Sequence, residues 1–162
     1  MKVMACLWVL LSSALVIPEL AAPPKNGPII AATGAFFALS VADILASAKW
    51  YSETLGLAVV KEEPKHEGAT VIVLEGRGLI VELIQHDAAV PLGTAAPGVK
   101  SSMLVHGIVK AGIIVADLDE TLAALRRKNV QIAFGPYPAR ADQRANVIIR
   151  DNAGNLIQLF GS

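Results

Sequence analysis

Cysteine is almost absent from this sequence. Cys6 is the only one in 162 residues. A lone cysteine excludes disulfides within the chain and zinc clusters that need several thiolates. Because Cys6 falls inside the N-terminal apolar segment described below, a cysteine-based active site in the folded part is excluded as well.

Excess charge of either sign is absent too. Lys and Arg together number 14, as do Asp and Glu, so the formal net charge is zero. A neutral chain has no long-range field that would draw it to nucleic acid or to an anionic membrane. We therefore expect no nucleic-acid partner. The hydrophobic share of 54% and the charged share of 17% predict a folded chain of about one domain.

A long hydrophobic run occurs only at the N-terminus. Residues 3–17 form a 15-residue apolar run behind a single lysine and ahead of a proline. A membrane-spanning helix needs roughly 20 such residues, whereas this length and position are typical of a secretory signal. We predict a signal peptide at residues 1–22 and an exported protein, periplasmic or secreted, with no stable membrane span after processing. An uncleaved N-terminal membrane anchor is the alternative, because Glu19 or Leu20 would fall at a cleavage-site position that favours small residues.

After a Pro- and Gly-containing linker at residues 23–33, one order of elements occurs twice. That order is strand, helix and three strands. The first copy is expected as a strand at 35–41, a helix at 43–55, and strands at 57–62, 69–74 and 79–85. The second is expected as a strand at 108–115, a helix at 118–128, and strands at 130–134, 145–150 and 155–160.

Two sequence matches indicate that this order is a tandem repeat. Residues 41–44 (Val-Ala-Asp-Ile) return at 115–118 (Val-Ala-Asp-Leu), an offset of 74, and residues 71–83 align without gaps with 147–159, an offset of 76. The agreement of the two offsets favours duplication over chance. The predicted domain at 34–161 divides into a module at 34–87, a connection at 88–105 and a module at 106–161.

The first helix has clear end signals and a clear buried face. Asp43 suits the N-terminal cap and Gly56 the C-terminal one. The apolar positions that follow the helical period are Ile44, Ala48, Tyr51 and Leu55. Trp50 is offset from this stripe and is either exposed or part of an interface between the modules.

Three segments resemble the vicinal oxygen chelate superfamily, which includes glyoxalase I, fosfomycin- and bleomycin-resistance proteins and extradiol dioxygenases. They are residues 36–43 (Phe-Phe-Ala-Leu-Ser-Val-Ala-Asp), residues 47–57 with Ser-Ala-Lys-Trp-Tyr and Leu-Gly-Leu, and residues 150–159 (Arg-Asp-Asn-Ala-Gly-Asn-Leu-Ile-Gln-Leu). The resemblance covers residues 34–161. It implies an α+β fold in which two tandem βαβββ modules form a curled mixed sheet around a cleft.

Side chains alternate along a strand, so every second residue faces the cleft that the resemblance implies. Phe36 and Ser40 share that side of one strand, and Glu82, Lys110 and Gln158 face it from others. In metal-dependent members, the positions of Phe36, Glu82, Lys110 and Gln158 resemble those of the metal ligands. Phenylalanine cannot bind a cation and lysine repels one, so we expect neither a metal nor another cofactor.

The three histidines do not form a preformed metal site by their spacing. His66 is expected in a charged, solvated turn. By the alternation of side chains, His86 falls on the same side as Glu82 and His106 on the same side as Lys110, at the rim of the expected cleft. Whether either histidine replaces a missing metal ligand stays open.

Lys110 interrupts an otherwise uncharged strand and has two readings. It either forms an ion pair with Glu82 or binds a carboxylate or enolate oxygen of a ligand as a metal-free electrophile. Glu82 correspondingly serves as an ion-pair partner or as a general base.

Two functions follow from the resemblance. The first is an exported lyase- or isomerase-like enzyme acting on a small oxygenated metabolite, with Glu82 and Lys110 as catalytic residues and Phe36, Ser40 and Gln158 as ligand-binding residues. The second is a non-catalytic small-molecule binding protein of the bleomycin-resistance type. A homodimer is an additional expectation, and conventional metal-dependent activity is not expected.

Overall fold

The computed structural model describes residues 34–162, which belong to one compact unit, Ala32–Ser162. The predicted signal peptide at 1–22 and linker at 23–33 lie outside the described residues.

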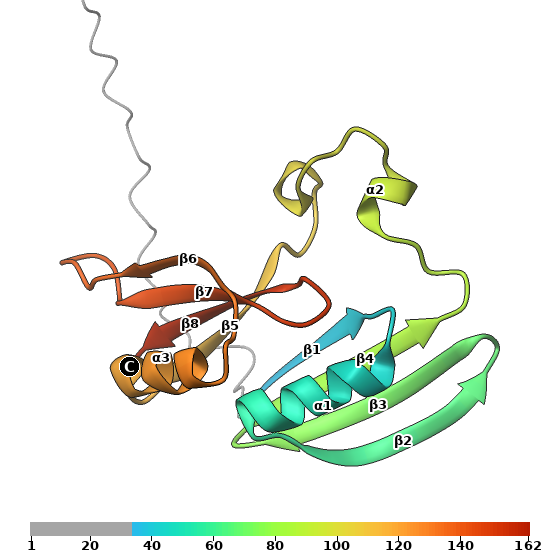
Figure 1. Ribbon diagram of the computed structural model, residues 1–162, viewed down its shortest axis with the longest axis horizontal. Helices are drawn as coiled ribbons and strands as arrows, with labels where there is room; N and C mark the ends of the chain where they lie inside the picture. Colours follow the sequence, from blue (N-terminus) through green and yellow to red (C-terminus); the bar gives the residue numbers. More distant parts are fainter. Residues whose placement is uncertain (1–33) are drawn as a thin grey trace, which may run out of the picture. The chain divides into compact units, whose positions relative to one another are not determined.

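The first module contains one helix and a four-stranded sheet, sheet A (Figure 1). Its elements are β1 (Ala35–Ser40), α1 (Ile44–Leu55), β2 (Ala58–His66), β3 (Ala69–Gly76) and β4 (Leu79–His86). The strand order is β1-β4-β3-β2, with β1 and β4 parallel and the other pairs antiparallel.

The second module repeats this arrangement as sheet B. Its elements are β5 (Lys110–Val115), α3 (Leu118–Arg127), β6 (Ile132–Tyr137), β7 (Asn146–Arg150) and β8 (Leu156–Gly161). The order β5-β8-β7-β6 again has one parallel pair, β5 with β8. The connection contains only two short helical turns, α2 (Leu92–Ala95) and η1 (Ser102–Leu104). The predicted α+β fold with two βαβββ modules is therefore confirmed.

Two details differ from the expectation. Within residues 34–162 no strand of sheet A pairs with a strand of sheet B, so the chain has two four-stranded sheets rather than one continuous curled sheet. In addition, β2 extends to His66, where a solvated turn was expected. The charges and proline of this stretch are compatible with a strand because β2 is an exposed edge strand throughout.

Both principal helices begin at the expected aspartates. The Asp43 carboxylate accepts a hydrogen bond from the Ala46 N–H at 2.9 Å, and the Asp117 carboxylate accepts one from the Glu120 N–H at 2.8 Å. Each carboxylate pairs an N–H that would otherwise have no partner in the helix. Gly56 ends α1 in the left-handed conformation, as a C-terminal glycine does.

One hydrophobic core contains residues of both modules. The predicted stripe of α1 is buried at Ile44, Ala48 and Tyr51 and half-buried at Leu55, and the stripe of α3 is buried at Leu118, Leu122 and Leu125. These helices cover one side of each sheet with apolar side chains. Among residues 34–162, no helix combines the length and apolar character that crossing a bilayer requires.

The other side of each sheet is more open. In β1 and β5, exposed residues alternate with half-buried ones, and Phe36, Ser40 and Lys110 are all exposed, as the predicted parity requires. Phe36 is 60% and Ile114 64% exposed. We call these sides the open faces of sheet A and sheet B.

Candidate functional site

A hollow of about 370 Å³ lies on the open face of sheet B. Lys110 reaches it from β5 and Gln158 from β8. The remaining lining residues come from β6, β7 and the loop between them: Tyr137, Arg140, Gln143, Asn146 and Ile148. Two of the predicted site residues therefore meet in one pocket.

The charge in this pocket has one sign. Lys110 and Arg140 are its only charged lining residues, and no carboxylate is among them. A short turn fixes the backbone of Arg140, whose N–H donates to the Gln143 carbonyl at 2.8 Å, with the reverse bond at 3.3 Å. Two cations beside neutral donors form a site suited to the oxygens of a small anion.

Gln158 is held in place by a buried amide. Its Nε2 donates to Oδ1 of Asn146 at 2.8 Å, and Nδ2 of Asn146 donates to the Arg144 carbonyl at 3.0 Å. Asn146 is only 1% exposed. The pocket floor thus has a fixed polar arrangement, which limits the reorganisation that a bound ligand would require.

Sequence reasoning missed Arg140, Tyr137 and Asn146. Parity can place residues within a strand, but Arg140 lies in the loop between β6 and β7, where periodicity carries no information. The available signal was compositional: a tyrosine, two arginines and a glutamine gather at residues 137–144 between two strands.

The other predicted residues lie on sheet A. Phe36 and Ser40 are exposed on β1 beside Ile80 and Ile84 of β4. Glu82 is half-buried on β4 between neighbours on β1 and β3. None of the three principal pockets of residues 34–162 contains Glu82 together with Lys110.

The expected ion pair between Lys110 and Glu82 is not formed. The four ion pairs found in residues 34–162 involve neither residue. Glu82 instead acts on Lys61: the pKa of Lys61 is raised mainly by its pairing with Glu63 and to a smaller extent by the charge of Glu82. Lys110 is therefore free of an acidic partner within the described part of the chain.

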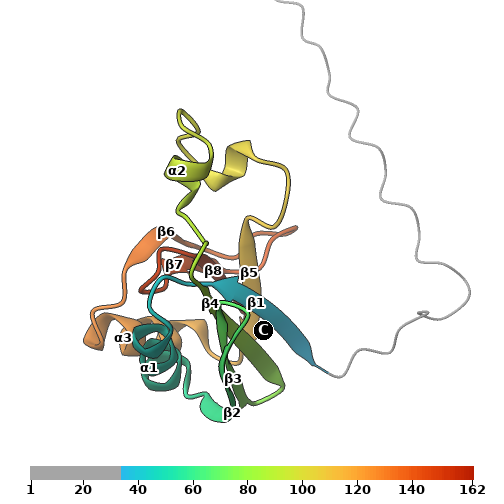
Figure 2. The ribbon, with the colours of Figure 1, turned by 90° about the vertical axis from the view of Figure 1, so that its right-hand side faces the viewer.

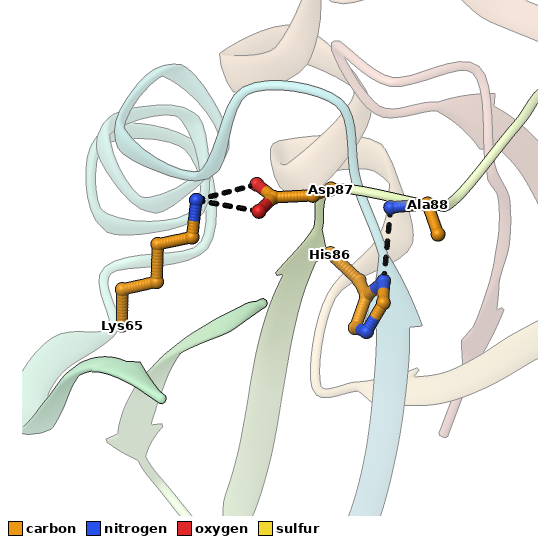
Figure 3. Close-up of polar contacts among 4 residues, drawn as sticks. All are labelled: Lys65, His86, Asp87 and Ala88. Atoms are coloured by element: carbon orange, nitrogen blue, oxygen red, sulfur yellow. Dashed lines mark hydrogen bonds and ion pairs between the residues drawn. The ribbon is translucent and has the colours of Figure 1, made fainter. Parts of the chain in front are cut away.

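The donor set does not suit a divalent cation. Residues 34–162 contain no group of three His, Asp or Glu side chains close enough to hold one. His66 is exposed at the end of β2, next to Glu67, and His106 is exposed ahead of β5. His86 ends β4, where its Nδ1 accepts the Ala88 N–H at 3.0 Å, next to the ion pair of Lys65 and Asp87 (Figure 3). At the four positions that resemble the family's ligands, Phe36 has no donor atom and Lys110 is a cation, which leaves one carboxylate, Glu82, and one amide, Gln158.

Tyr51, expected only as packing, also joins the two modules. Its hydroxyl donates to Oδ2 of Asp151 at 2.9 Å across 100 residues of sequence. Asp151 accepts three more hydrogen bonds, from the Ala153 N–H and from the N–H and side-chain amide of Asn155. Tyr51 is fully buried and Asp151 is 5% exposed. Burial, followed by the nearby charge of Asp151 and the hydrogen bond to it, raises the pKa of Tyr51.

Trp50 lies beside this junction. It is half-buried, and it lines a cavity of about 500 Å³ with residues of both modules, among them Lys128 and Asn152. Lys128 donates to the Glu53 carbonyl, and Asn152 donates to the Ser47 hydroxyl at 3.2 Å. The residues around this cavity of about 500 Å³ form contacts between the two modules. The pocket of about 370 Å³ instead contains Lys110, which has no acidic partner among residues 34–162, so we assign the candidate site to that pocket.

Comparison with solved structures places the fold among glyoxalase-like proteins. Glyoxalase I of Leishmania major is 23% identical, with a TM-score of 0.56, and the match covers 78% of this chain and 84% of that one. The antibiotic-binding protein TnmS3 from Streptomyces sp. CB03234 is 17% identical, with a TM-score of 0.57, covering 88% and 98%. A glyoxalase family protein from Enterococcus faecalis is 16% identical, with a TM-score of 0.61, covering 78% and 94%.

No curated protein matches the chain by sequence. The sequence profile of the Glyoxalase/Bleomycin resistance protein/Dioxygenase superfamily matches residues 34–159, which is nearly the whole described region. The matched region includes Lys110, Arg140 and Gln158 of the pocket, as well as Glu82. The chain therefore belongs to the glyoxalase/bleomycin resistance protein/dioxygenase superfamily.

Proposed function

We propose that this protein is an exported binding protein for a small, anionic, oxygen-rich molecule, held on the open face of sheet B without a metal. The observation that carries the proposal is the pocket around Lys110 and Arg140, which has two cations and no carboxylate. A carboxylate or ketoacid would place its oxygens on these two side chains, while Tyr137 and Gln143 supply uncharged donors.

The test is a thermal-shift screen of small carboxylates and ketoacids against the full chain. We expect hits that stabilise the wild type and that lose at least tenfold in affinity in Lys110→Met and in Arg140→Met, because each variant removes one charge-assisted hydrogen bond. Lys49→Met is the matched control: Lys49 is an exposed lysine on α1 outside the pocket. Elemental analysis of the same sample should find no stoichiometric divalent metal.

Two results would reject the proposal. A ligand that stabilises wild type and Lys110→Met equally would remove Lys110 from binding. About one nickel, zinc, iron or manganese ion per chain would contradict metal-free binding. The variants should fold normally, because both side chains are exposed and the apolar core is untouched.

A lyase or isomerase activity is the second candidate, and Glu82 is the residue that favours it. Glu82 is a half-buried carboxylate on the open face of sheet A, able to take a proton from the carbon beside a carbonyl while Lys110 stabilises the resulting enolate oxygen. The proton would return to the neighbouring carbon in an isomerase. Since none of the three principal pockets contains both Glu82 and Lys110, we place this reaction between two copies of the chain.

We also propose a homodimer in which the open faces meet. The face of sheet A carries Glu63, Glu75 and Glu82 together with Lys61, whereas that of sheet B carries Lys110 and Arg140, so the net charges of the two faces are opposite. Edge strand β1 has no charged residue or proline and edge strand β5 has only Lys110, whereas edge strand β2 carries several charges and a proline. Sedimentation should show a dimer for wild type and a monomer for Phe36→Glu, which adds another carboxylate to this face. A wild-type monomer at all concentrations would reject this assembly.

Export is the remaining part of the proposal, and the apolar run at residues 3–17 supports it. Expression in the source cell should yield a protein outside the cytoplasm whose N-terminus falls between about Ala21 and Lys25 by N-terminal sequencing. A cytoplasmic protein that still begins at Met1 would refute export. A membrane-bound protein that retains Met1 would show that the run is an anchor.

A further inference from the structure

The connection between the modules is the most exposed apolar segment of the described chain. We call residues 88–109 the arm. It contains six large hydrophobic residues that are more than a third exposed, and α2 and η1 within it have no buried residue. The six are Val90, Leu92, Met103, Leu104, Val105 and Ile108. Figure 1 and Figure 2 both show α2 and η1 standing outside the two sheets.

The exposure is greatest at one tip. Met103 is 65%, Leu104 72% and Ile108 95% exposed. Single exposed hydrophobic residues are ordinary, but several within six residues of sequence mark a surface that another phase or molecule covers.

The charge around the tip has one sign. From residue 88 to residue 116 the sequence contains no Asp or Glu, whereas Lys100 and Lys110 flank the tip on either side. The chain as a whole is neutral, so this is a local feature and gives no long-range attraction. Lysines that flank an apolar tip can place their ammonium groups among anionic headgroups while the apolar side chains enter the boundary below.

The backbone of the tip suits an apolar environment as well. The N–H of Leu104 donates to the Ser101 carbonyl at 3.0 Å and that of Val105 to the Ser102 carbonyl at 3.1 Å. The Met103 N–H donates to the Ser101 hydroxyl at 3.2 Å. Three consecutive donors therefore have partners within the turn, which lowers the cost of leaving water.

We propose that the tip of the arm, Met103 to Ile108 with Lys100 beside it, inserts into the surface of a membrane that contains anionic lipid, while Lys110 stays in the ligand pocket. The domain would then bind its small ligand while resting on the bilayer. The apolar side chains supply the affinity, and the acid-free flanks supply the preference for anionic lipid.

The test follows the tip directly, because the N-terminal run of the full chain could itself bind lipid. In the full chain with Cys6→Ser, Ser102→Cys provides a single attachment site for an environment-sensitive fluorophore on η1. With vesicles of mixed phosphatidylcholine and phosphatidylglycerol, we expect a blue shift, and at least tenfold weaker binding to phosphatidylcholine alone. The same label at Asp119→Cys, on the exposed first turn of α3, is the control and should not shift.

Variants of the tip complete the experiment. Met103→Ser with Leu104→Ser should abolish the shift at position 102 with no loss of thermal stability, because both side chains are exposed. Lys100→Glu should weaken binding to the anionic vesicles about tenfold. If the protein binds the vesicles but the fluorophore at position 102 shows no blue shift, the proposal is overturned. A shift without vesicles that grows with protein concentration would overturn it too, because a second copy would then cover the tip.

Discussion

Asp151→Ala should reduce the free energy of unfolding by at least about 3 kcal/mol. Asp151 is the acceptor for four hydrogen bonds, and its removal leaves the buried Tyr51 hydroxyl and two backbone N–H groups without it. The Tyr51 hydroxyl is fully buried, and an unsatisfied buried donor costs about 1–3 kcal/mol. The two backbone N–H groups lie nearer the surface and each add a smaller loss, so the sum exceeds that of an ordinary surface change. Urea unfolding at neutral pH measures the difference.

Two further variants sharpen this result. Asp151→Asn keeps the size and one acceptor oxygen but places an amide against donors, so we expect about half of the loss. Asp142→Ala removes an exposed aspartate from the turn beside Arg140 and should cost less than about 0.5 kcal/mol. Equal stabilities of Asp151→Ala and Asp142→Ala would show that the buried carboxylate does not hold the modules together.

Tyr51 should ionise only when the protein unfolds. It is fully buried and its hydroxyl donates to Asp151, so the folded protein offers no solvated environment for its phenolate. Burial raises the pKa of Tyr51 in the folded state above its unfolded value. Its contribution to stability is therefore complete below pH about 10 and is lost as the pH rises further, by about 1.4 kcal/mol per pH unit.

Near-ultraviolet titration and unfolding at several alkaline pH values test this. Tyr51→Phe should lose this part of the pH dependence and be about 1–2 kcal/mol less stable at neutral pH, because Asp151 loses one of its donors. Tyr137→Phe changes an exposed side chain and should leave stability almost unchanged. A Tyr51 phenolate signal near pH 10 in the folded protein would contradict the buried hydrogen bond.

The order of the elements was predictable because it depends on local signals. Asp43 and Asp117 begin helices through hydrogen bonds to residues three positions ahead, and the exposed positions of β1 and β5 follow from alternation alone. The repeat also predicts that the two parallel strand pairs have the same register. Ala38 lies beside Glu82 in sheet A, and Gly112 lies beside Gln158 in sheet B.

The contacts between distant residues were not predictable in the same way. Tyr51 fitted the helix stripe, and nothing in its neighbourhood indicated a partner 100 residues away. The expected pairing of Glu82 with Lys110 assumed that matched strands of the two modules converge, yet the sheets share no strand pair within residues 34–162. His66 was wrongly expected in a turn because the charged residues around it were taken to indicate one. An exposed edge strand such as β2 tolerates such charges.

The bond between Tyr51 and Asp151 also has a consequence for the order in which the chain acquires its structure. Its donor lies in the first helix, but its acceptor lies in the last turn between strands, β7 and β8. A ribosome or an export channel that releases the chain from the N-terminus completes sheet A well before residue 151 emerges. During that interval the Tyr51 hydroxyl has no Asp151 to accept its hydrogen bond, and the first module lacks the core residues that the second supplies. The first module therefore reaches its final stability only after the last 12 residues have been released. The folding of these residues is the step that completes the domain.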